Sequence, residues 1–101
     1  MNQPELRNVE TIRAYLEELV RAKRPMQFWI PQPGAVPFET TLERVEREVF
    51  SITTTPVLEV GQVLHLAFML DFRRFISQTQ VLGPGTFRLP ASIRHGESQR
   101  G

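Results

Sequence analysis

The 101-residue chain contains no cysteine. This absence excludes disulfide bonds, thiolate nucleophiles and cysteine-ligated zinc, so stability must come from packing. Long apolar runs are also missing, because no stretch approaches the roughly 18 residues that cross a bilayer. The N-terminal residues MNQPELRNVE lack the apolar segment of a signal peptide. We therefore expect a soluble, cytoplasmic protein without a membrane partner.

A strong excess of one charge is missing as well. The 12 basic residues, of which only Lys23 is a lysine, nearly balance the 11 acidic ones, and the net charge is +1. Because the two signs are mixed along the chain, no large field attracts polyanions. The composition therefore predicts no nucleic-acid partner.

Signatures of catalysis are absent too. Neither histidine, His65 or His95, has an acidic residue at metal-ligand spacing on a helix. The serines lack a GxSxG elbow, and the GPG sequence at 83–85 is typical of a turn rather than a phosphate loop. The charges at 43–48 are better explained as a solvated turn than as an acid–base pair. We predict no enzyme activity, no catalytic residue, no metal and no cofactor.

The first element that the sequence does contain is an amphipathic helix. Its apolar residues recur at steps of three and four, which places them on one helical face: Val9, Ile12, Leu16, Leu19 and Val20. Asn8 is a suitable N-cap, and Pro25 prevents continuation. The pattern predicts a helix over residues 8–23.

After Pro25 the apolar period changes to two, which is typical of strands. The segment 38–55 also fits a helical face, but its threonines and Ile52 favour two strands with a turn near Arg47. Further strands are predicted in MQFWI, VLHLAFML, FISQTQVL and TFRLP. The sequence thus predicts a mainly β fold with one N-terminal helix and about six short antiparallel strands in a small barrel or sandwich. We expect the helix to cover one opening.

Two aromatic residues are candidates for partner contacts. Trp29 alternates out of the Met26, Phe28, Ile30 set, and it either anchors an interface or covers the barrel end. Phe72 stands beside Arg73 and Arg74 in DFRRF, where the arginines either stack on a planar ligand or remain solvated. We predict these residues, together with the later Arg94, as partner-binding positions.

The order of these features, over about residues 9–100, resembles the N-terminal domain of YcgR-type flagellar brake proteins, which precedes a PilZ domain. The resemblance rests on the hydrophobic pattern, the helix–proline junction at Arg24-Pro25, and the Leu-Pro-x-x-Ile element of Leu89, Pro90 and Ile93. It implies a split, PilZ-like six-stranded barrel over residues 1–93. Residues 94–101 would then be a basic flexible tail or the start of a linker to a PilZ domain.

The resemblance also implies a ligand. In that family the arginines of the linker bind cyclic di-GMP, and here Gln99 and Arg100 resemble its beginning. Arg94 is followed four residues later by Ser98 instead of a second arginine, and no Asp/Asn-x-Ser-x-x-Gly stretch occurs. Micromolar binding needs about 8 kcal/mol, whereas one charge-assisted hydrogen bond supplies roughly 1.5–3. We therefore expect cyclic di-GMP binding only if a PilZ domain follows.

The resulting functional prediction is a non-enzymatic interaction module in cyclic di-GMP signalling that affects flagellar motility or surface attachment. Its partner would be a flagellar motor or switch component, or an adjacent PilZ domain. The sequence does not decide whether the chain also forms a homodimer. One alternative is a flavin-binding split barrel similar to flavin reductases. A second is a small-barrel nucleic-acid binder, which needs aromatic residues interleaved with lysine and arginine.

Overall fold

The N-terminal helix forms as the sequence predicts. The computed structural model describes residues 5–53 and 57–95, and helix α1 spans Val9–Ala22. The Asn8 side chain accepts hydrogen bonds from the backbone N–H groups of Glu10 and Thr11, at 2.9 and 3.0 Å. Lys23 ends the helix in the left-handed conformation, with φ of 55°. The predicted cap and both predicted ends are therefore correct to within one residue.

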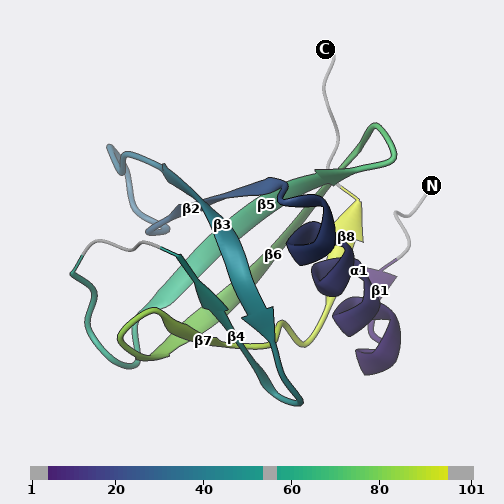
Figure 1. The fold of residues 1–101 in the computed structure, drawn as a ribbon. Coiled ribbons are helices and arrows are strands. Elements are labelled where there is room, and N and C mark those ends of the chain that lie inside the picture. The colour runs from purple at the N-terminus through teal and green to yellow at the C-terminus, as the bar shows by residue number, and fades with distance from the viewer. Residues whose placement is uncertain (1–4, 54–56, 96–101) are drawn as a thin grey trace, which may run out of the picture.

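The strands close into a barrel (Figure 1). The barrel strands are β2 (Pro25–Trp29), β3 (Phe38–Val45), β4 (Val49–Ile52), β5 (Val63–Leu70), β6 (Arg73–Gly83) and β7 (Thr86–Arg88). Their order is β6-β5-β2-β3-β4-β7, and β7 pairs again with β6. All pairings are antiparallel, so the predicted six-stranded antiparallel barrel with one helix is confirmed.

Two short strands extend the sheet beyond the barrel, and the sequence did not predict them. They are β1 (Glu5–Leu6) and β8 (Ile93–His95). Strand β6 pairs with β8 through Phe75 and Ile76 but with β7 through Val81 and Gly83, so the barrel is closed at one end and split at the other. The boundary expected after Ile93 falls inside β8, and the rest of the expected tail, 96–101, lies outside the described residues.

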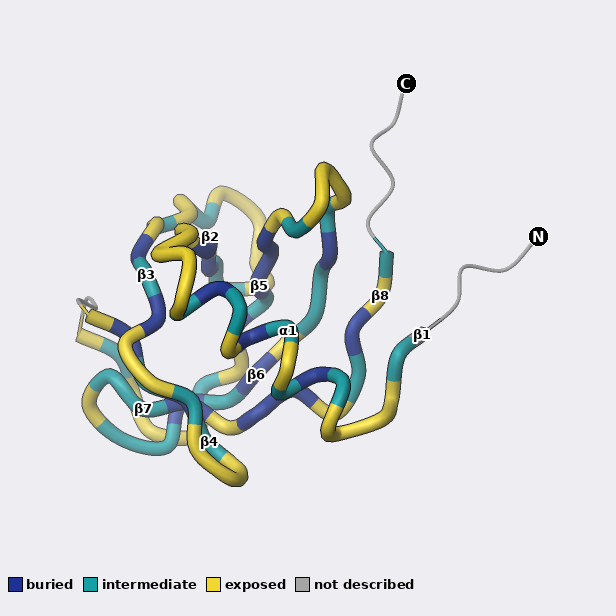
Figure 2. The backbone as a smooth tube through the Cα atoms, turned by 45° about the vertical axis from the view of Figure 1, so that its right-hand side comes forward, coloured by how far each residue is buried: buried dark blue, intermediate teal, exposed yellow. Residues whose placement is uncertain are grey.

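The core joins the helix to the strands. Ile12, Leu16 and Leu19 of α1 have no exposed surface and belong to one cluster with the inward residues of the barrel. Helix α1 packs against β3, and Tyr15 contacts the Phe75 ring of β6 at 5.3 Å between centroids. The helix therefore covers the split end of the barrel, as expected, and its dark buried stripe is visible in Figure 2.

The β5–β6 hairpin turns through two residues with left-handed backbone. Asp71 has φ of 52° and Phe72 has φ of 63°, while the Phe72 side chain is fully exposed. Glycine adopts this conformation without the steric cost of a Cβ atom. We expect Phe72→Gly to raise the free energy of unfolding by about 1 kcal/mol in urea denaturation. Phe72→Ala keeps the Cβ atom and should give no such gain, and equal effects of the two variants would contradict the explanation.

Candidate functional site on the outer sheet face

The register of the sheet places several polar and aromatic side chains on one outward surface. Along β2, β5 and β6 they alternate with inward core residues such as Phe28, Leu66 and Phe75. One outward row joins Trp29, His65 and Gln78, and the next joins Gln27, Ala67, Ile76 and Arg94. Met69 and Arg74 form the third. We call the outward residues of β2, β5, β6 and β8, together with Arg24 and Glu39 beside them, the outer face.

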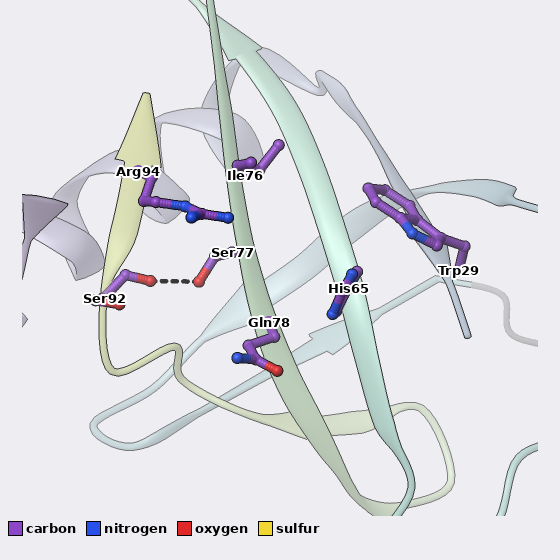
Figure 3. A pocket seen from close by; sticks show the side chains of 7 residues that line it. All are labelled: Trp29, His65, Ile76, Ser77, Gln78, Ser92 and Arg94. Atoms are coloured by element: carbon purple, nitrogen blue, oxygen red, sulfur yellow. Dashed lines mark hydrogen bonds between the residues drawn. The ribbon is translucent and has the colours of Figure 1, made fainter. Parts of the chain in front are cut away.

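One hollow on the outer face has a volume of about 200 Å³. Its lining is shown in Figure 3: Trp29, His65, Ile76, Ser77, Gln78, Ser92 and Arg94. The Trp29 and His65 rings meet edge to face at 5.8 Å between centroids. The Ser77 hydroxyl donates to the Ser92 carbonyl, which ties the segment before β8 to β6. The hollow therefore combines two aromatic rings, an amide and a guanidinium on a fixed backbone.

Another hollow lies nearer the β5–β6 hairpin and has a volume of about 240 Å³. Its lining is Arg24, Pro25, Gln27, Glu39, Ala67, Phe68, Met69 and Arg74. Ala67 is only 3% exposed although it points outward, because its small side chain lies between larger neighbours. The Gln27–Ala67–Ile76 row contributes to both hollows, so together they extend across the face from β2 to β8.

The charges that line the two hollows are mainly positive. Arg24, Arg74 and Arg94 line them together with one carboxylate, Glu39. Among the side chains that the structure describes, those of residues 6–53 and 57–95, none forms an ion pair with these three arginines. By contrast, a hydrogen bond to Glu18 and its negative charge raise the pKa of Arg21, which lies on the exposed surface of α1. Arg24, Arg74 and Arg94 therefore give the two hollows an excess of positive charge over the one carboxylate that lines them.

The structure brings together some of the predicted partner-binding residues and separates others. Trp29, Arg74 and Arg94 share the outer face, and Trp29 lies against His65 instead of covering the barrel end under α1. Phe72 and Arg73 lie at the hairpin end, where Arg73 pairs with Leu70. The predicted ligand-binding residue Arg100 lies outside the described residues.

Sequence reasoning did not name three outer-face residues, His65, Gln78 and Ile76, as site residues. They alternate with core residues in VLHLAFML and FISQTQVL, so their outward direction was available from the pattern. Their position beside Trp29 and Arg94 depends on the strand register, which the pattern does not contain.

Other kinds of site find no support in the described part of the chain. No three histidine, aspartate or glutamate side chains there gather around a point where they could hold a metal ion. No helix among these residues has the length and apolar character needed to cross a membrane.

The helix-covered split barrel defines the class of fold, which is PilZ-like. It is similar to solved structures of MrkH from K. pneumonia: the complex with c-di-GMP (TM-score 0.81, 16% identity, 98% of this chain and 46% of that chain) and the apo state (TM-score 0.80, 16% identity, 99% and 46%). A third structure is of MrkH described as a c-di-GMP-dependent transcription regulatory factor (TM-score 0.81, 16% identity, 99% and 44%).

These similarities show the fold alone, and the chain spans less than half the length of MrkH. No protein-family model matches the chain, and no curated protein matches it. The finer assignment to the N-terminal domain of YcgR-type proteins is not confirmed.

The expectation that nucleic acid is not a partner is wrong. MrkH shares this fold over 98–99% of the chain, and it is described as a transcription regulatory factor. The expectation rested on the net charge of +1. A net charge averages over the whole surface, so it does not report a local excess of arginine on one face.

Proposed function

We propose that the chain is a non-enzymatic regulatory module of a cyclic di-GMP signalling protein. The observation that carries this proposal is the fold shared, over nearly the whole chain, with MrkH in its c-di-GMP complex and its apo state. The regulated process, flagellar motility or surface attachment, is proposed only on the resemblance to YcgR-type proteins.

The barrel itself is proposed to transmit the signal rather than to hold the nucleotide alone. On β8 the only arginine is Arg94, which lies in the outer face opposite Ile76. One charge-assisted hydrogen bond supplies about 1.5–3 kcal/mol, well short of the roughly 8 kcal/mol of micromolar binding. Arg100 is proposed to contribute to the nucleotide site together with residues beyond this barrel.

Affinity capture tests the proposed function. The tagged gene product, expressed in its own cells, should be retained on immobilised cyclic di-GMP and eluted by free cyclic di-GMP but not by GMP. Arg100→Ala should weaken retention, whereas Arg47→Ala, an exposed arginine in the β3–β4 turn, should not. Passage of the unmodified gene product through the resin would contradict the proposal.

The isolated 101-residue chain provides a second measurement. We expect no saturable isotherm when it is titrated with cyclic di-GMP in a calorimeter. A saturable micromolar isotherm would place the nucleotide site inside this chain. It would contradict the proposal that the barrel does not hold the nucleotide alone, but it would support a function in cyclic di-GMP signalling.

A further inference from the structure

We propose that the outer face binds the phosphate backbone of duplex DNA through Arg24, Arg74 and Arg94. This inference names a partner for the proposed regulatory module and rests on that function for its biological role. Its physical basis is separate, since it depends only on the charges and spacing of the outer face.

The three arginines are distributed across the sheet. Arg94 on β8 lies opposite Ile76 of β6, Arg74 lies two residues before Ile76 on the same side of β6, and Arg24 immediately precedes β2. Adjacent strands are about 4.8 Å apart, so the three steps from β2 through β5 and β6 to β8 span about 14 Å. This width is close to the roughly 12 Å of the DNA major groove, so cations at the two sides can reach phosphates of both strands.

The groups between the arginines suit a polar anionic ligand. Gln27 and Gln78 offer amide donors and acceptors, and Figure 3 shows the Arg94 side chain extending from β8 toward β6. Glu39 is the single carboxylate that lines the two hollows.

The charges favour an anionic polymer as the occupant, and the exposed apolar groups of the face are too scattered to favour an anionic membrane. Trp29 is half-buried against His65, and Val63 and Met69 are 41% and 46% exposed. A membrane surface would be expected to bury a larger contiguous apolar area than this.

Salt dependence of DNA binding tests the proposal. We expect fluorescence anisotropy with a labelled duplex of about 30 base pairs to show binding at 50 mM salt, weakening about 40-fold at 200 mM, because three phosphate contacts give a slope near −2.7. The double variant Arg74→Gln/Arg94→Gln leaves one contact, so its affinity should fall only about 3-fold over the same range, from a weaker starting value.

The matched control is Arg44→Gln/Arg47→Gln, which removes the same charge near the β3–β4 turn. It should retain the steep salt dependence, and circular dichroism should show that both double variants are folded. Equal weakening by the two double variants, or no binding at 50 mM salt, would overturn the proposal. Co-sedimentation with phosphatidylserine vesicles gives a further test. If Arg74→Gln/Arg94→Gln lost binding to the vesicles but kept its affinity for the duplex, the arginines would bind a membrane and the proposal would be overturned. These measurements use no cyclic di-GMP, so their failure is distinguishable from failure of the capture experiment.

Discussion

Phe28→Ala is expected to lower the free energy of unfolding by about 3–5 kcal/mol, the cost of removing a large core ring. Phe28 has no exposed surface. Its ring contacts those of Phe38 and Phe87 at 5.4 Å and that of Phe50 at 6.3 Å between centroids. These residues come from β2, β3, β4 and β7, so one truncation weakens packing among four barrel strands. Domains of this size have about 5–15 kcal/mol of net stability, and the variant should be close to unfolding.

Urea denaturation followed by circular dichroism measures this loss. Phe72→Ala is the matched control because it makes the same substitution at a fully exposed ring, where the change should stay within about 0.5 kcal/mol. Comparable losses in the two variants would show that the phenylalanine cluster does not stabilise the barrel.

The main fold was predictable because its signals are local. The three- and four-residue spacing of α1 and the alternation in β5 and β6 each arise within one segment. The ambiguous segment 38–55 forms β3 and β4, as its β-branched residues indicated. Strands β1 and β8, with two and three residues, are too short to display a period, and they form only because each finds a distant partner.

Some residues of the candidate site were predictable from the sequence, but their arrangement was not. Trp29, Arg74 and Arg94 were identified one by one from residue type and alternation, but their common face follows from the register Trp29↔His65 and Ile76↔Arg94. Such registers join residues more than 15 positions apart, and no single segment encodes them. The net charge was misleading for the same reason, since it does not record which arginines share a face.

A substitution in the buried stripe of α1 is expected to have the second large effect on stability. Leu16 lies in the middle of the buried stripe of the helix, between Ile12 and Leu19, over the split end of the barrel. At the split end, β6 pairs with β8 and not with β7, so the sheet does not close around the core. The helix supplies the apolar cover there, whereas the continuous sheet supplies it at the other end.

Leu16→Asp is therefore expected to unfold the domain at neutral pH. Loss of the leucine side chain costs about 2–5 kcal/mol, and burial of an unpaired carboxylate adds several more, which together reach the roughly 5–15 kcal/mol available. Burial raises the pKa of the new carboxyl group, so the native state binds more protons than the unfolded chain and the destabilisation should grow as pH rises from about 4 to 7.

Near-ultraviolet circular dichroism at both pH values measures the effect. Glu17→Asp, at the exposed neighbouring position, should keep the native signal, and a native signal from Leu16→Asp at pH 7 would show that the helix does not close the barrel.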